Sequence, residues 1–356
     1  MKFGRKNTIS TCLIFFALLF LPGFSATSSA ADPQRQEGKD FSNLQTRTTI
    51  FPKWFKQSFW DLNDDIADAR KAGKTGILIY SSATTCTYCI AFIERSFNNP
   101  EIGQRLRKQF DVLGMEVIDD AEITDVDGKA YLVKDFLKKY KAYVTPTLLF
   151  FGKDGKLLLK ITGYYPPEKF MQVLDYLEGS YYEHESWRAY SARQGKTADA
   201  DGVIKDAALF DSDPVNLDRR DGKAKKPLLV LFDKPGCDAC KELHDKVLSV
   251  KSTRDWIGRF DAVQINAADG LHKIVTPDGK PLSAMDWVNA LDIAYYPAFV
   301  FFDESGKEVF RLDTYIRNVR LEGAMELVLN KGYVDEPQLQ RWRHRQSAGE
   351  QANQNR

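Results

Sequence analysis

The chain has 356 residues, 43% of them hydrophobic and 12% aromatic, which is enough apolar material for two ordinary domains. Its 50 basic and 49 acidic residues nearly cancel, so the composition does not favour nucleic acid or an anionic membrane surface as a partner. The function must therefore be sought in motifs, and not in bulk charge.

The N-terminal segment has the pattern of a secretory signal. Three basic residues precede an uninterrupted apolar run at 12–21, and a stretch of small residues ends at Ala30. A membrane anchor is the alternative, but the run is about half of the ~20 residues that a spanning helix needs. We therefore predict a cleavable signal peptide over residues 1–30 and a periplasmic location, and we expect Cys12 to leave with the signal.

The other four cysteines form two Cys-x-x-Cys pairs, and both pairs belong to a sequence repeat. Five landmarks recur at an offset of 151 residues: Cys86 with Cys237, Cys89 with Cys240, Pro146 with Pro297, Asp127-Gly128 with Asp278-Gly279, and Phe150-Phe151 with Phe301-Phe302. Partners this close in sequence close almost no loop, so a disulfide Cys86–Cys89 or Cys237–Cys240 adds little chain-entropy stabilisation. The pairs therefore indicate redox chemistry in a compartment where disulfides persist.

Both copies have the same order of predicted elements, β-α-β-α-β-β-α. In the first copy the pattern predicts helices at 63–71, 86–97, 101–110, 131–141 and 166–177, and strands at 76–80, 112–117, 147–151 and 156–161. In the second copy it predicts strands at 228–232, 262–266, 298–302 and 308–312, and helices at 237–247, 283–291 and 319–329. We expect a first domain at 31–190, a linker at 191–205, a second domain at 206–342 and a disordered polar tail at 343–356.

These elements and motifs together resemble the thioredoxin superfamily over nearly all of both copies. The first copy (TTCTYCIAFIERSFNNPEIGQRLRKQFDV, VTPTLLFFGKDGK, ITGYYPPEKF) is similar to periplasmic thioredoxins of the SoxW-like type, and the second (PGCDACKELHDKVL, YYPAFVFFDESGKEV) is more diverged. The resemblance implies an α/β fold of two tandem thioredoxin-like domains, each a central mixed β-sheet flanked by helices. It also implies a cis peptide bond before Pro146 and before Pro297.

The first cysteine of each pair, Cys86 or Cys237, is the predicted nucleophile. It should cap a helix N-terminus, where the helix dipole and unpaired backbone donors favour the thiolate, the form that attacks a disulfide. Cys89 and Cys240 lie one helical turn deeper, close enough to resolve the mixed disulfide. All four cysteines are therefore predicted catalytic residues.

The two proline segments, Thr145-Pro146 and Tyr296-Pro297, are expected to face the sulfurs. The backbone of the residue before each proline can then pair with an extended substrate segment. The two sites are not equivalent, because Asp238 places a carboxylate beside Cys237 that opposes thiolate formation. We predict that the second site is the weaker acid and the less oxidising pair.

Both copies depart from the ordinary thioredoxin pattern next to the cysteines. The usual Trp before the first cysteine is Thr85 or Gly236, and the buried acidic residue six positions before that cysteine is Tyr80 or Leu231. Proton transfer to the resolving cysteine must therefore use another group or water.

The sequence favours neither a metal nor another cofactor. Zinc ribbons separate their two Cys-x-x-Cys pairs by ~15 to 20 residues, whereas Cys89 and Cys237 are far apart in the chain. His244 follows Cys240 on the same helix, but the first copy has Ile93 at the equivalent position. We expect a solvent-facing histidine there, and not a copper or zinc ligand.

The leading hypothesis is a periplasmic thiol-disulfide oxidoreductase that works as a protein-disulfide reductase. The resemblance implies a membrane dithiol electron donor of the DsbD or CcdA type and disulfide-containing exported proteins as substrates. Two alternatives stay open. One is a redox-inactive or regulatory binding or assembly module with thioredoxin folds, and the other is a disulfide isomerase or oxidase.

Overall fold

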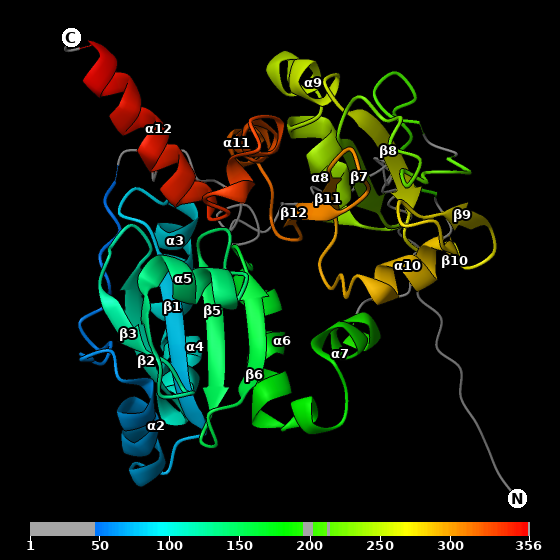
Figure 1. Cartoon of the computed structure of the whole chain (residues 1–356). Helices are drawn as coiled ribbons and strands as arrows, with labels where there is room; N and C mark the ends of the chain where they lie inside the picture. The colour runs from blue at the N-terminus through cyan, green and yellow to red at the C-terminus, as the bar shows by residue number, and fades with distance from the viewer. Residues whose placement is uncertain (1–46, 195–201, 212–213, 355–356) are drawn as a thin grey trace, which may run out of the picture. The chain divides into compact units, whose positions relative to one another are not determined.

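The computed structural model describes residues 47–194, 202–211 and 214–354. The predicted signal peptide lies outside the described residues, as does the middle of the predicted linker. Within the described residues, the two sequence copies form two similar α/β units, and each is built on a four-stranded sheet (Figure 1). The predicted fold class is therefore confirmed.

Each sheet is mixed and has the same topology. The first has the order β2-β1-β5-β6, from Phe110–Glu116, Gly76–Ser82, Thr147–Gly152 and Leu157–Thr162. The second has the order β8-β7-β11-β12, from Asp261–Asn266, Leu228–Asp233, Ala298–Phe302 and Glu308–Leu312. In both sheets the first two strands are parallel and the other neighbouring pairs are antiparallel. The central strands β1 and β7 therefore carry the chain directly into the two Cys-x-x-Cys motifs.

Helices flank the sheets. In the first unit they are α2 (Leu62–Lys71), α3 (Thr87–Phe92), α4 (Pro100–Gln109), α5 (Val133–Lys139), α6 (Pro167–Glu178) and α7 (Trp187–Gln194). In the second they are α8 (Asp238–Lys246), α9 (Lys251–Ile257), α10 (Ala284–Ala290), α11 (Asn318–Leu329) and α12 (Leu339–Gln354). The closing helices α6 and α11 obey the same 151-residue offset as the sequence landmarks.

The strand pattern places apolar side chains on both faces of the second sheet. Leu229 and Leu231 of β7 pack in one buried cluster with Leu243 of α8. Val230 faces the other way, into a cluster with Trp287 of α10. Burying one such side chain is worth roughly 1.5 to 3 kcal/mol. Because successive side chains of β7 point to opposite faces of the sheet and both faces are buried, this strand packs against a helix on each side.

The central strand of the first sheet begins at a glycine for a steric reason. A Cβ atom at Gly76 would lie 1.9 Å from the carbonyl oxygen of Phe151 on the neighbouring strand β5. Every residue of β1 is buried. The glycine therefore allows β1 to pair closely with β5 at the start of the active-site segment.

Several elements differ from the sequence prediction. The helix expected at 86–97 is α3 followed by a π-helical turn, η2 (Ile93–Phe97). Two small hairpins were not predicted: β3 with β4 (Glu122–Thr124 and Ala130–Leu132) and β9 with β10 (Lys273–Val275 and Pro281–Ser283). Each hairpin closes around one of the Asp-Gly turns of the repeat, so the predicted turns lie inside short strand pairs.

The prediction of a disordered polar tail at 343–356 is wrong for the described part of that tail, because helix α12 continues to Gln354. The first turn of α12 anchors this helix to the rest of the protein. Leu339 and Trp342 are buried in the core of the second unit, and Arg341 is 9% exposed. The Arg341 guanidinium donates to the carbonyl of Val117 at 2.8 Å and pairs with Glu336 at 3.0 Å. A polar sequence forms a helix here because three early side chains hold it against the protein.

Equivalent positions of the two copies contact each other. Gly163 and Thr314 are related by the 151-residue offset, and a Cβ on Gly163 would lie 2.0 Å from Thr314 Oγ1. The rings of Tyr164 and Tyr315, the next equivalent pair, meet edge to face with centroids 6.0 Å apart. This contact between equivalent residues is the kind found at the axis of a two-fold dimer.

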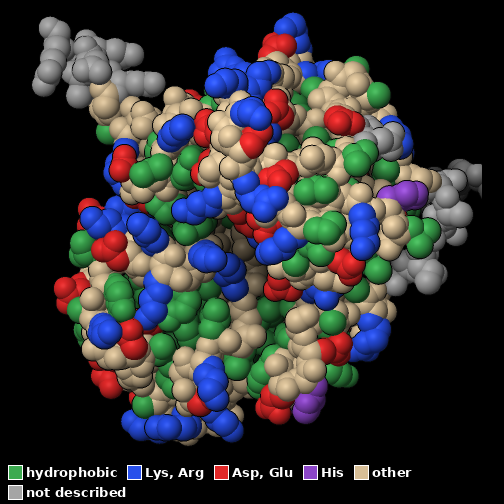
Figure 2. Space-filling model, turned by 45° about the vertical axis from the view of Figure 1, so that its right-hand side comes forward, with side chains coloured by type: hydrophobic (Ala, Val, Ile, Leu, Met, Phe, Trp, Pro, Cys, Tyr) green, Lys and Arg blue, Asp and Glu red, His purple; other side chains and the backbone are tan. Residues whose placement is uncertain are grey.

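Basic and acidic side chains are interspersed on the face of the molecule drawn in Figure 2. This agrees with the balanced composition. No helix among the described residues is long and apolar enough to cross a membrane.

Candidate functional site

Each Cys-x-x-Cys pair forms a disulfide at the start of a helix. Cα atoms are 5.2 Å apart in Cys86–Cys89 and in Cys237–Cys240. Cys86 is the N-cap of α3, and its Sγ accepts a hydrogen bond from the N–H of Cys89 at 3.1 Å. Cys237 is the N-cap of α8 and accepts from the N–H of Cys240 at 3.0 Å. The first sulfur of each pair therefore lies where backbone donors and the helix dipole stabilise negative charge after reduction.

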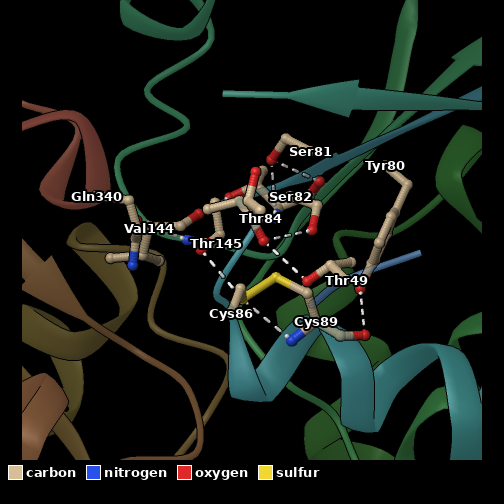
Figure 3. The surroundings of a disulfide bond; sticks show 12 residues. Thr49, Tyr80, Ser81, Ser82, Thr84, Cys86, Cys89, Val144, Thr145 and Gln340 are labelled. Atoms are coloured by element: carbon tan, nitrogen blue, oxygen red, sulfur yellow. Dashed lines mark hydrogen bonds between the residues drawn. A yellow bond between two sulfur atoms is a disulfide. The ribbon is translucent and has the colours of Figure 1, made fainter. Parts of the chain in front are cut away.

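The first disulfide lies against Thr145, one of the predicted substrate-binding residues. The Thr145 hydroxyl donates to Cys86 Sγ at 3.3 Å, and the Thr145–Pro146 peptide bond is cis. Figure 3 shows Thr145 between this disulfide and Gln340. The structure thus brings together residues that are 59 positions apart in the chain.

Tyr80 lies beneath the first disulfide, at the position where thioredoxins carry a buried acid. Its hydroxyl donates to the carbonyl of Cys89 at 2.9 Å. Complete burial raises the pKa of Tyr80 well above its ordinary value. The phenol therefore holds the helix backbone by a hydrogen bond but stays protonated, and it does not replace the missing carboxylate as a base.

Both peptide groups of Thr145 are occupied by side chains from the second copy. Its N–H donates to Gln340 Oε1 at 3.2 Å, and its carbonyl accepts from Arg320 Nη2 at 2.5 Å. The Arg320 guanidinium also lies over the ring of Tyr88, at 3.5 Å from its centroid. Cys86 is only 5% exposed. The groups expected to pair with an extended substrate are therefore already bonded at the first site.

The second site is more open. Cys237 is partly exposed, and Asp238 after it is exposed. The Tyr296–Pro297 peptide bond is cis, and within the described residues the N–H and carbonyl of Tyr296 make no hydrogen bond. Strand β11 begins directly after Pro297 and pairs with β7, which places Tyr296 at the end of the sheet that leads to Cys237. Burial raises the pKa of the Tyr296 hydroxyl to about 12.

A buried polar network lies under helix α8, and sequence reasoning missed it. His244 is buried, so the expectation of a solvent-facing histidine is wrong. Its Nε2 lies 2.8 Å from Asp233 Oδ2, which also accepts from Gln264 Nε2 at 2.6 Å. Among the described residues, Asp233 Oδ1 has no hydrogen-bond partner. This network places two titratable groups on the segments that flank the second Cys-x-x-Cys pair.

The first copy has none of these three groups. At the 151-residue offset, Asp233, His244 and Gln264 correspond to a serine, an isoleucine and a leucine, namely Ser82, Ile93 and Leu113. An aspartate four residues before one Cys-x-x-Cys pair and a histidine four residues after it could have signalled the network. No group of His, Cys, Asp and Glu in the described part of the chain could hold a metal ion.

Comparison with known protein families assigns both copies to one family. A model of the thioredoxin-like domain matches residues 62–178 and again residues 217–329, which together make up more than half of the chain. Each match contains one Cys-x-x-Cys pair and one cis-proline. A search of curated proteins found no match.

Several solved structures with a thioredoxin fold are similar to less than half of this chain. A thioredoxin-fold protein from Helicobacter pylori is 21% identical, with 41% of this chain and 92% of that chain covered at a TM-score of 0.32. A thioredoxin from Thermus thermophilus is 20% identical, with coverages of 33% and 84% and a TM-score of 0.27. The C-terminal domain of DsbD from Neisseria meningitidis is 15% identical, with coverages of 31% and 87% and a TM-score of 0.25.

Proposed function

Because the chain belongs to the thioredoxin-like domain family, with one match in each copy, we propose that it is a periplasmic thiol-disulfide oxidoreductase that reduces disulfides of exported proteins. The periplasmic location rests on the predicted signal peptide, and the reducing direction on the absence of a cation within either Cys-x-x-Cys dipeptide.

The observation that carries the proposal is the geometry of the second site. A helix-capping sulfur, Cys237, is partly exposed beside a cis-proline segment, and the N–H and carbonyl of the preceding residue, Tyr296, form no hydrogen bond with the described part of the chain. Free backbone groups of this kind can pair with an extended chain, as an exposed sheet edge does. Such a site supports exchange with a disulfide held in an unfolded or extended protein segment.

The reaction is a dithiol-disulfide exchange. The Cys237 thiolate attacks one sulfur of the substrate disulfide, that S–S bond breaks, and the other substrate sulfur leaves as a thiolate and takes a proton. The Cys240 thiolate then attacks Cys237 Sγ, and the second substrate sulfur leaves. The products are a reduced substrate and the Cys237–Cys240 disulfide, so two electrons pass from the protein to the substrate. A membrane dithiol carrier of the DsbD or CcdA type is proposed to restore the Cys237–Cys240 dithiol.

Trapping of mixed disulfides tests the proposal directly. Cys240→Ser and Cys89→Ser variants are expressed in the periplasm, and their covalent partners are identified by mass spectrometry. We expect Cys240→Ser to hold exported proteins through Cys237, because the resolving thiol is missing. The matched control carries Cys237→Ser as well and should trap nothing at this site. If neither nucleophile captures a protein, the chain is a binding or assembly module.

The reduction potential of each pair separates the reductase from an oxidase. Thioredoxin-like reductases lie near −270 mV, whereas the strong oxidant DsbA lies near ~−120 mV. Each potential is measured in a variant that retains one pair. A value for the second pair close to that of DsbA would overturn the reducing direction.

A further inference from the structure

The first site has a solvent cavity that the second copy helps to form. The cavity has a volume of about 720 Å³ and lies beside Cys86. It is lined by Thr85, Cys86 and Tyr88 of the first unit and by residues of α11 and α12. Its volume falls within the ~300 to 1,000 Å³ of typical small-molecule sites. A small molecule could therefore reach a sulfur that a protein chain cannot approach along Thr145.

The charged residues of the cavity are mostly cations. Arg317, Arg320 and Arg343 line it, and among the described residues of its wall Glu326 is the one carboxylate. Guanidinium groups bind carboxylates and other planar anions through paired hydrogen bonds. The composition of the wall therefore favours an anionic ligand.

Arg320 is the most buried of these three cations. The residue is 4% exposed, and within the described residues it forms no salt bridge and its Nη1 has no hydrogen-bond partner. Burial lowers the pKa of its guanidinium. A buried cation without a counter-ion is unfavourable, and an anion in the cavity would compensate its charge.

We propose that the first site exchanges with small anionic thiols and disulfides, and that Arg320 binds the anionic group of these molecules. The inference rests on the proposed function, because it assigns a substrate class to one of the two exchange sites. A protein substrate is excluded from this site by Gln340 and Arg320, which occupy the N–H and carbonyl of Thr145. Residues of the second copy thus bind the small anion and also keep a protein substrate away from the first site.

The exchange balances without another reactant. One small thiolate attacks Cys86 Sγ, the Cys86–Cys89 bond breaks, and Cys89 leaves as a thiolate. A second small thiolate attacks the sulfur of the bound small molecule, and Cys86 leaves. Two small thiols are oxidised to one small disulfide while the Cys86–Cys89 disulfide is reduced to a dithiol. The reverse reaction reduces the small disulfide at the expense of the dithiol.

The test uses the full chain with Cys237→Ser and Cys240→Ser, which leaves one disulfide. The oxidised protein is reduced by three probes of similar size: 2-mercaptoethanesulfonate, which is anionic, 2-mercaptoethanol, which is neutral, and cysteamine, which is cationic. Rates are compared at equal thiolate concentration. We expect the anionic probe to react about tenfold faster than the neutral one, the factor that corresponds to one charged hydrogen bond. Cysteamine should be the slowest.

Substitutions of arginines in the cavity wall test whether the cavity causes the preference for the anionic probe. Arg320→Gln should bring the anionic and neutral probes to nearly equal rates, and Arg320→Lys should retain part of the difference. Arg343→Gln, at an exposed position, should lower the preference without affecting folding. The matched control is Lys251→Gln, which removes an exposed cation on α9 and should leave the preference intact. Equal rates for all probes in the parent protein, or an unchanged preference in Arg320→Gln and Arg343→Gln, would overturn the inference.

A second variant separates this inference from the proposed function. The chain with Cys86→Ser and Cys89→Ser retains the second site and is assayed for reduction of insulin disulfides. If this variant reduces insulin while the first site shows no preference for anions, only the inference fails. If it does not reduce insulin, the proposed function fails whatever the small probes show.

Discussion

The two active-site regions share a scaffold and differ in what surrounds the sulfur. At the first site, Cys86 is almost fully buried and the peptide groups of Thr145 are bonded to Gln340 and Arg320. At the second site, Cys237 is partly exposed and the peptide groups of Tyr296 are unbonded among the described residues. The same helix-capping chemistry can therefore serve different substrates, because access is set by residues outside the Cys-x-x-Cys motif.

The largest expected effect comes from removing one nucleophile at a time. Cys237→Ser should reduce the insulin-reducing activity to background, because the thiolate that attacks protein disulfides is lost. Cys86→Ser, the matched variant of the first copy, should retain most of this activity. Both are measured by insulin turbidity with dithiothreitol as the electron source. Equal losses of insulin-reducing activity in the two variants would show that the covered first site and the open second site do not differ in their access to protein disulfides.

A smaller effect is expected from the network that only the second copy has. His244→Ile, which introduces the residue of the first copy, should lower the free energy of unfolding by about 3 kcal/mol, because the buried Asp233 carboxylate loses its histidine partner and retains only the amide of Gln264 among the described residues. Adding Asp233→Ser should recover much of that loss, since the buried carboxylate is then removed as well. Urea unfolding of the oxidised proteins measures both. If the double variant is as unstable as the single one, the pair does not act as a unit.

The smallest effect concerns Lys169 on α6. The other closing helix, α11, carries a second basic residue, Arg320, at the equivalent position. Burial lowers the pKa of Lys169 to about 8. The unfolded chain, with an ordinary lysine, binds more protons than the folded one above pH 8. The free energy of unfolding should therefore rise with pH from about 8 toward 10, by at most ~1.4 kcal/mol per pH unit from this group.

Urea unfolding at several pH values measures that slope. Lys169→Met should flatten it relative to the parent protein, whereas Lys251→Met, at an exposed position, should not. Equal slopes in the parent and in Lys169→Met would show that Lys169 is not desolvated in the folded state. The two closing helices would then differ more in the surroundings of their equivalent basic residues than the structure indicates.

The repeat made much of the fold predictable from the sequence. The landmarks at one fixed offset located both Cys-x-x-Cys pairs, both proline segments and the two strand hairpins, β5 with β6 and β11 with β12. These features are local, or they depend on hydrophobic periods of two and 3.6 residues. The predicted fold class was therefore confirmed in both copies.

The parts that could not be predicted depend on contacts between distant residues. Arg320 and Gln340 are 175 and 195 positions from Thr145, and neither belongs to a motif. His244 alone gives no sign of a buried partner, and the signal lies only in its spacing from Asp233 on strand β7, 11 positions earlier. The helix in the polar tail depends on anchoring by Leu339 and Trp342, which composition alone does not show.

The contact between Gly163 and Thr314 limits how alike the two halves of the chain can become. Near a two-fold axis a residue faces its own counterpart, and here the space beside Thr314 leaves no room for a Cβ on the other side. Gly163 also has a φ of +75°, which disfavours a threonine at that position. If gene conversion copied the second half of the chain onto the first, position 163 would become a threonine. Two threonine side chains would then compete for the space that Thr314 occupies. Divergence at this position is thus a condition for the duplicated halves to pack together.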